Sequence, residues 1–280
     1  MNSEKEFSDM NYSHYNDFYF KSVLHKRANG LLKFIGIPYK IERIILSEYT
    51  TLEPGISRID FAGDARKDGK TVSLILECQS KLPTDEDINR FFRYVASLRI
   101  FKNNNVDLYI LCTQKAQYDK KEFIINDECI YTMHVISLKE FKAREIFKNI
   151  EDKLKNNREV TDDDIASLQV IVYTDHDEPQ VEILLKAREL IERIAVNSKM
   201  DINEKTAIIR LLDVLSTNML EEDELNQYEE ETYMLLNPTD RFLLKKGKLD
   251  VAKNMIKEGY SIEEIVKLTG LSKNDVLNAK

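Results

Sequence analysis

The stretch ISRIDFAGDARKDGKTVSLILECQSK, residues 56–81, predicts a β-hairpin around which the rest of the fold is arranged. Its middle is Asp68-Gly69, a pair that favours a tight two-residue turn because both positions tolerate positive φ. Counting outward from this turn places Asp60 directly opposite Glu77. The sequence therefore predicts two carboxylates that face each other across neighbouring strands.

Side chains alternate between the two faces of a strand, so the hairpin divides into two sets. The expected apolar face holds Ile59, Phe61, Ala65, Val72, Leu74, Leu76 and Cys78. The expected polar face holds Arg58, Asp60, Asp64, Arg66, Thr71, Ser73, Glu77, Gln79 and Lys81.

The opposed carboxylates need a compensating charge, because cross-strand partners lie about 5 Å apart and like charges there are destabilising. A divalent cation is one compensation, since hard cations prefer carboxylate oxygens. Two alternatives stay open at this point. The turn can differ by one residue, which moves the register, or Arg58 and Lys81 can neutralise the pair as a surface cluster.

Length and composition limit the class of protein. A chain of 280 residues suits one large domain, or a core with one or two appendages. No apolar run is long enough to span a membrane, and the polar N-terminus lacks the pattern of a signal peptide, so we expect a cytoplasmic protein with no membrane partner. The cysteines and histidines are scattered without metal-ligand spacing, which argues against a zinc site or a disulfide framework. These residues are Cys78, Cys112, Cys129, His14, His25, His134 and His176.

The net charge of −8 is unevenly distributed. Residues 1–145 carry 22 Lys and Arg against 21 Asp and Glu, whereas residues 146–280 carry 19 against 28. An acidic total argues against indiscriminate coating of nucleic acid, but local basic patches can still bind phosphate.

The elements around the hairpin predict a mixed α/β core. Residues 15–36 have helical periodicity, with a break expected at Asn29-Gly30 and with Asp17 in the first turn, where a carboxylate also favours the helix dipole. Strands are expected at 40–53, at 106–113 and in two pieces between 123 and 138. A turn at Pro54-Gly55 leads into the hairpin.

A helix beginning after Thr84 has two faces of different chemistry. Thr84 is a good N-cap, and the acidic residues 85–87 fill the first turn. Ile88, Phe91, Phe92, Val95 and Leu98 have core spacing, and Arg90, Arg93, Tyr94 and Ser97 fall on a neighbouring face. That second face either borders the carboxylate pair, where arginines can hold phosphate, or is solvated.

The remainder is predicted to be helical, near 139–156, 162–170, 180–197, 202–219, 221–236 and 240–258. The run Asp162-Asp163-Asp164 follows Thr161 and is typical of a helix N-terminus rather than a metal site. In the tail, Ser261 with Glu264 predicts a capping box, and Ser272 predicts the cap of a last short helix. Two short helices joined by a turn at Gly270 are typical either of a helix-turn-helix, with Lys273 and Asn274 near the DNA, or of a helical hook that packs on other helices.

Four segments together resemble a known family. RID at 58–60 with LILECQSK at 74–81 resembles the D-(x)n-E-x-Q variant of the PD-(D/E)xK nuclease superfamily. NDFYFKSVL (16–24), RFFRY (90–94) and GKLDVAKNMIKEGYSIEEIVKLTGLSKNDV (247–276) are similar to segments of the Rpn-type recombination-promoting nuclease and transposase family. Roughly residues 145–235 carry no matching motif.

The resemblance implies a restriction-endonuclease-like fold and a Mg²⁺-dependent endonuclease that acts on DNA, without an organic cofactor. It implies that Asp60, Glu77 and the backbone carbonyl of Cys78 supply metal ligands, with Asp17 as a further carboxylate. With a DNA substrate, we expect Arg90, Arg93 and Tyr94, on the helix face that can border the carboxylate pair, to contact DNA.

One residue departs from the general superfamily pattern. Gln79 stands where a lysine is usual, and a neutral amide can orient water but cannot lower its pKa as a cation can. Lys81, two residues further on, is our candidate for the missing charge.

These observations divide the chain into a nuclease-like core (1–145), a helical region (146–240) and a helix-turn-helix-like tail (241–280). Double-strand cleavage by one metal site per chain calls for two chains, so a homodimer is a possible assembly. The rival functions are an inactive nuclease fold that binds DNA or a protein partner, and a binding module built on the tail.

Overall fold

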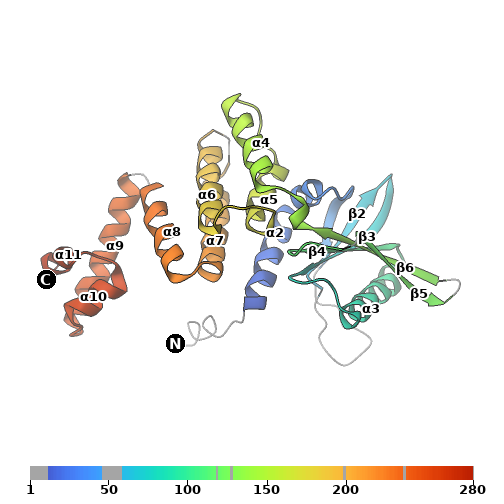
Figure 1. Cartoon of the computed structure of the whole chain (residues 1–280), viewed down its shortest axis with the longest axis horizontal. Coiled ribbons are helices and arrows are strands. Elements are labelled where there is room, and N and C mark those ends of the chain that lie inside the picture. The colour runs from blue at the N-terminus through green and yellow to red at the C-terminus, as the bar shows by residue number, and fades with distance from the viewer. Residues whose placement is uncertain are drawn as a thin grey trace. The chain divides into compact units, whose positions relative to one another are not determined.

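The computed structural model describes residues 12–45, 59–117, 119–126, 129–197, 200–235 and 238–279. The chain forms two compact units, residues 1–225 and residues 226–280. The described part of the first unit holds a six-stranded sheet with helices, and that of the second holds helices (Figure 1). The expected mixed α/β core with helices toward the C-terminus is confirmed.

The sheet is built from an antiparallel meander extended by parallel strands. Its strands are β1 (Lys40–Ile45), β2 (Phe61–Lys67), β3 (Lys70–Gln79), β4 (Val106–Cys112), β5 (Lys120–Asn126) and β6 (Cys129–Ser137). Their order is β1-β2-β3-β4-β6-β5. Pairs β1–β2, β2–β3 and β5–β6 are antiparallel, and pairs β3–β4 and β4–β6 are parallel. The hairpin β2–β3 therefore lies inside the sheet, with a partner on each side.

The predicted hairpin turn and its register are confirmed. Asp68 and Gly69 have φ values of 50° and 76°, as a type I′ turn requires. Phe61 lies opposite Leu76, so the next pair outward is Asp60 and Glu77.

Helices cover both faces of the hairpin. The helix α3 (Asp85–Lys102) packs on the face that holds Ala62 and Ile75, in one apolar cluster with Phe91. On the opposite face, His25 of the helix α2 (Tyr12–Phe34) contacts Phe61, with ring centroids 6.4 Å apart. The face that the sequence predicted to be polar is therefore apolar in its middle, where Ala62 and Ile75 pack with side chains of α3. Figure 1 shows α3 lying along the sheet.

The break in α2 lies earlier than predicted, at Arg27, whose backbone is non-helical (φ −138°, ψ 36°). The predicted break at Asn29-Gly30 is wrong, and both residues have packing roles instead. The Asn29 side chain exchanges two hydrogen bonds with the Ile41 backbone of β1, at 2.7 and 3.2 Å. A Cβ at Gly30 would lie 2.6 Å from the carbonyl oxygen of Asp162, so only glycine permits this approach of α2 to its neighbour.

The remaining helices agree with the predicted pattern. They are α4 (Ala143–Lys155), α5 (Asp162–Gln169), α6 (Gln180–Asn197), α7 (Ile202–Met219), α8 (Glu222–Leu235) and α9 (Pro238–Lys257). Short 3₁₀ turns span Leu138–Glu140 and Ile171–Tyr173. The first turn explains why α4 begins later than the predicted residue 139.

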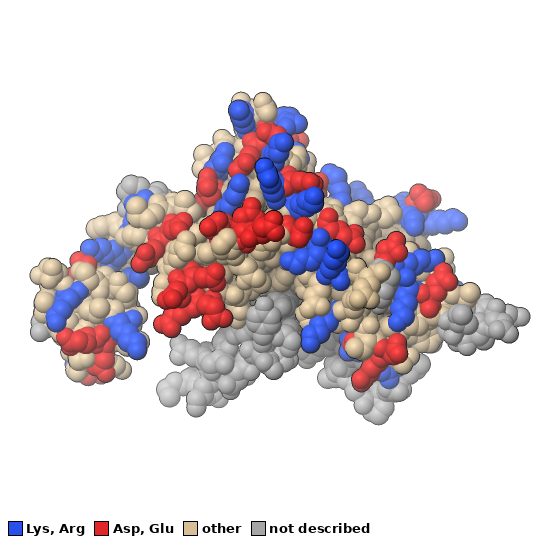
Figure 2. All heavy atoms as spheres, viewed as in Figure 1, with Lys and Arg blue, Asp and Glu red and all other residues tan. Residues whose placement is uncertain are grey.

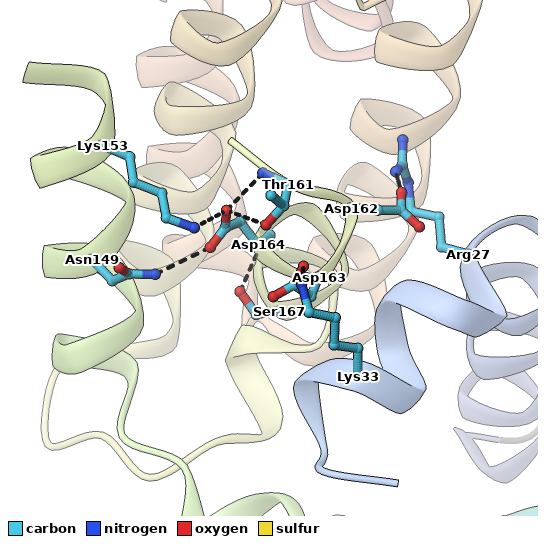
Figure 3. A network of polar contacts seen from close by, with 9 residues as sticks. All are labelled: Arg27, Lys33, Asn149, Lys153, Thr161, Asp162, Asp163, Asp164 and Ser167. Atoms are coloured by element: carbon cyan, nitrogen blue, oxygen red, sulfur yellow. Dashed lines mark hydrogen bonds and ion pairs between the residues drawn. The ribbon is translucent and has the colours of Figure 1, made fainter. Parts of the chain in front are cut away.

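The aspartate run at the start of α5 is a cap, as predicted. Thr161 and Asp164 form a capping box, and the Asp164 carboxylate also accepts hydrogen bonds from Lys153 (2.6 Å) and Asn149 (3.1 Å) of α4. The three aspartates point toward different partners in Figure 3.

The same run joins α5 to α2. Asp162 pairs with Arg27, which is buried and also pairs with Glu204 of α7. Asp163 pairs with Lys33 at 2.8 Å (Figure 3). Because these pairs connect α2 to helices far along the chain, α2 is held on the side away from the sheet as well.

The second unit has its own small core. Helices α10 (Ile262–Thr269) and α11 (Lys273–Asn278) pack on α9 through a cluster of apolar side chains. The buried members are Ala252, Ile265, Leu271 and Val276. The predicted capping box of Ser261 and Glu264, the cap at Ser272 and the turn at Gly270 (φ 64°) are all confirmed.

Some predicted features lie outside the described residues: the second half of the strand expected at 40–53, the turn at Pro54-Gly55 and Arg58. Among the described helices, none is both long enough and apolar enough to cross a membrane.

Candidate active site

Asp60 and Glu77 meet at the open end of the hairpin and hold each other through the backbone. The Asp60 N–H donates to Glu77 Oε1 at 3.0 Å, and the Cys78 N–H donates to Asp60 Oδ2 at 2.9 Å. Both residues are buried, with 8% and 2% of their surface exposed. The predicted juxtaposition of the two carboxylates is confirmed, and it is fixed by reciprocal hydrogen bonds rather than by packing alone.

A cation from α2 lies beside this pair. The Lys21 ammonium nitrogen is 3.3 Å from Asp60 Oδ1, and its side chain is 25% exposed. Lys21 lies between buried residues of α2, with Tyr19, Phe20 and Val23 at most 2% exposed. The position of its backbone is therefore set by the helix core.

The electrostatics of the pair are costly without a bound cation. Burial raises the pKa of the Glu77 carboxyl well above 4.5, and the neighbouring Asp60 charge raises it further. The hydrogen bond from the Asp60 backbone, and then the charges of Arg90 and Lys21, lower the pKa in part. The charges of two cations from different helices, Arg90 of α3 and Lys21 of α2, thus act on Glu77.

The donor set suits a hard divalent cation. Asp60 and Glu77 offer carboxylate oxygens, and in a strand the carbonyl of Cys78 points to the same side as its N–H, which faces Asp60. No group of three or more His, Cys, Asp or Glu side chains suited to a metal occurs among the described residues. Asp17 is one helical turn before Lys21 in α2, and its side chain lies outside the described part of the chain.

Gln79 and Lys81 lie in different surroundings. Gln79 is the last residue of β3 and is half-buried, and its backbone carbonyl accepts from Thr113 N–H at 3.1 Å. Lys81 follows the end of the strand and is exposed. The alternation that placed Lys81 on the face of Gln79 assumed a longer strand, so it does not apply.

The three residues expected on the basic face of α3 lie in different surroundings. Arg90 pairs with Asp87 at 3.0 Å and its guanidinium carbon lies 5.0 Å from the centre of the Phe91 ring. Arg93 is exposed. Tyr94, however, is only 3% exposed and lies in the core, because its helical position turns it toward the sheet.

The two tail residues lie in the second unit, at the start of α11. Both Lys273 and Asn274 are exposed. Lys273 forms an ion pair with Glu263 of α10, at 3.1 Å.

Lys21 is the residue that sequence reasoning did not assign to the site. Its signal was present, since Lys21 is the lysine of the Asp-x-x-Phe-Lys segment at 17–21.

Comparison with protein-family models, curated proteins and solved structures finds no match for this chain.

Proposed function

We propose that this chain is a divalent-metal-dependent DNA endonuclease with a restriction-endonuclease-like core. The observation that carries the proposal is the buried pair of Asp60 and Glu77 at the end of an interior hairpin. A structural role explains this arrangement poorly, since the pKa of Glu77 stays raised even with the charges of Lys21 and Arg90 acting on it, so the pair still destabilises the metal-free fold. The order of helix, antiparallel meander, helix and parallel strand also supports the proposed fold.

In this proposal, Asp60, Glu77 and the Cys78 carbonyl hold the metal. When bound, Mg²⁺ stabilises negative charge on the scissile phosphate and makes water more acidic. Arg90, at the edge of the site, and the exposed Arg93 hold phosphates of the DNA backbone. Gln79, on the strand that carries Glu77, orients the attacking water through its amide.

Charge on the molecular surface supports local rather than extended DNA contact. On the face shown in Figure 2, Lys and Arg side chains are interspersed with Asp and Glu. Arg90, whose charge acts on Glu77, provides such a local contact, whereas tight DNA binding usually needs more phosphate contacts.

The test is cleavage of supercoiled plasmid by purified protein with Mg²⁺. Wild type should nick or cut the DNA, and EDTA should stop it. Asp60→Asn and Glu77→Gln keep the shape of the side chains but remove metal-binding charge, so each should lower the cleavage rate by at least about 100-fold.

Asp85→Asn is the matched control, because Asp85 is an almost fully exposed carboxylate (97%) at the start of α3. Its cleavage rate should stay near that of wild type. Wild-type activity in both site variants would reject the assigned centre. Retention of DNA without cleavage in any divalent metal would instead identify an inactive nuclease fold.

The second unit supports another candidate function, DNA binding through a helix-turn-helix-like tail. The observation in its favour is the independent core of α9, α10 and α11, which leaves Lys273 and Asn274 exposed. The same packing also suits the simpler helical hook.

A further inference from the structure

We propose that Lys21 is the catalytic cation of the endonuclease, in the role that a lysine at position 79 would otherwise have. The inference rests on the proposed nuclease function and adds a residue from a different element of the fold. Lys21 belongs to α2, whereas the carboxylates belong to the hairpin.

The first argument is position. Lys21 Nζ lies 3.3 Å from Asp60 Oδ1, so an oxygen held by Asp60 and Glu77 is within reach of the same ammonium. Gln79 carries no charge, and Lys81 lies beyond the end of β3 and is exposed. The guanidinium of Arg90 is already paired with Asp87.

The second argument is rigidity. The backbone around Lys21 is fixed because Tyr19 donates through its hydroxyl to the Gln169 carbonyl and Arg27 is paired with acids of α5 and α7. Because these contacts hold the backbone of α2 in place, the Lys21 ammonium needs little reorganisation to reach the transition state. Preorganised charge of this kind is what stabilises a transition state most effectively.

The chemical step is hydrolysis of a phosphodiester. The oxygen of a water molecule forms a bond to phosphorus, and the bond from phosphorus to the leaving oxygen breaks. The water proton passes through solvent to the leaving oxygen, which gives one phosphomonoester and one hydroxyl end. The Lys21 ammonium keeps its charge throughout and contacts a non-bridging phosphate oxygen, on which negative charge increases in the transition state.

The alternative is that Lys21 only neutralises the carboxylate pair. The two roles differ in what happens at saturating metal. A neutralising lysine becomes dispensable once a divalent cation occupies the pair, whereas a catalytic lysine is still required.

The experiment compares Lys21→Met, Lys21→Arg and Lys26→Met. Lys26 is an exposed residue of the same helix, so its substitution by Met is a matched control for helix propensity and charge. Three quantities are measured for the full chain: Mn²⁺ affinity by calorimetry, DNA affinity in Ca²⁺, and single-turnover cleavage at saturating Mg²⁺.

We expect Lys21→Met to lower the cleavage rate by at least about 100-fold while Mn²⁺ affinity stays within about threefold of wild type or becomes tighter. Lys21→Arg should recover part of the rate, and Lys26→Met should cleave like wild type. A Lys21→Met rate near that of wild type would overturn the proposal, and so would a loss of Mn²⁺ affinity of about tenfold or more.

The outcome also separates this proposal from the nuclease function. If wild type cleaves, Asp60→Asn does not, and Lys21→Met does, the endonuclease stands and the role of Lys21 fails. If wild type itself does not cleave in any divalent metal, both fail together.

Discussion

Glu77 is a residue whose own charge works against the fold. It is 2% exposed and adjacent to another carboxylate, and both circumstances raise its pKa. Functional sites commonly retain such groups because the same electrostatics that destabilise the empty site favour the binding of a cation. The carboxylate pair is therefore expected to lower the stability of the metal-free protein.

The destabilising effect of the buried Glu77 carboxylate predicts that Glu77→Gln increases the stability of the folded protein in a pH-dependent way. The folded-state pKa of Glu77 lies above its ordinary value of 4.5, so above pH 4.5 the unfolded chain loses the proton while the folded chain still holds it. The stability of wild type therefore falls as pH rises from 4.5 toward the raised pKa. Gln keeps the acceptor for the Asp60 N–H but has no proton to lose.

We expect Glu77→Gln, without metal, to be more stable than wild type near neutral pH. Urea unfolding at several pH values measures the difference, which should vanish below pH 4.5. Mg²⁺ should stabilise wild type but not the variant. A variant that is less stable than wild type at neutral pH would show that the carboxylate contributes favourably to the empty fold.

At this scale the sequence predicted the pair but missed its cation. The pair follows from local rules, because Asp68-Gly69 fixes the turn and strand alternation does the rest. The Asp-x-x-Phe-Lys segment contains Lys21, but the contact of Lys21 with Asp60 depends on how α2 docks on the sheet, which the segment alone does not specify. Strand alternation does not extend to Lys81, because β3 ends at Gln79.

At the scale of the elements, the close approach of α2 and α5 is the most specific packing feature. A Cβ at Gly30 would lie 2.6 Å from the Asp162 carbonyl oxygen and 2.7 Å from its carboxylate. A Cβ at Gly247 of α9, by contrast, would have no described atom of another element within 4 Å. The two glycines are thus a matched pair of helical positions with opposite surroundings.

We expect Gly30→Ala to destabilise the protein by about 1–3 kcal/mol, because the clash exceeds the gain in helix propensity. Gly247→Ala should stabilise its helix by up to about 1 kcal/mol. Hydrogen exchange with mass spectrometry reports on the two helices separately. Slower exchange in α2 of Gly30→Ala would contradict the close contact.

Most elements were predictable because their signals are local: caps, turns and hydrophobic periodicity. The errors in α2 and α3 share one cause, which is that tertiary packing gave a different role to a residue with an ambiguous local signal. Asn29-Gly30 has the composition of a helix break, but Asn29 hydrogen-bonds to β1 and Gly30 packs closely against α5. Tyr94 has the chemistry of a DNA contact, but its side chain lies in the core between α3 and the sheet.

At the scale of the whole molecule, the two units allow separate tests of cleavage and of DNA binding. The carboxylate pair belongs to the first unit, and Lys273 and Asn274 belong to the second. If the tail binds DNA, its loss should change affinity without abolishing the chemistry.

We expect the double substitution of Lys273 and Asn274 by Ala to weaken binding to a DNA duplex by about three- to tenfold, while cleavage at saturating protein persists. Lys267→Ala is the control, because Lys267 is an exposed lysine of α10 in the same unit. Fluorescence anisotropy measures the affinity. Unchanged binding in the double variant would leave the tail as a packing hook and remove its proposed DNA role.

The contacts of α2 with later helices also determine when, during synthesis, the proposed cleavage site is completed. Arg27 meets acids that follow it by 135 and 177 residues, and Tyr19 meets a carbonyl 150 residues later. Contacts of such separation form late, because a long loop must close first. A ribosome therefore releases the hairpin carboxylates well before the helices that support α2 exist. On the proposed role of Lys21, the rigid support of the cleavage site is complete only after Glu204 has emerged from the ribosome.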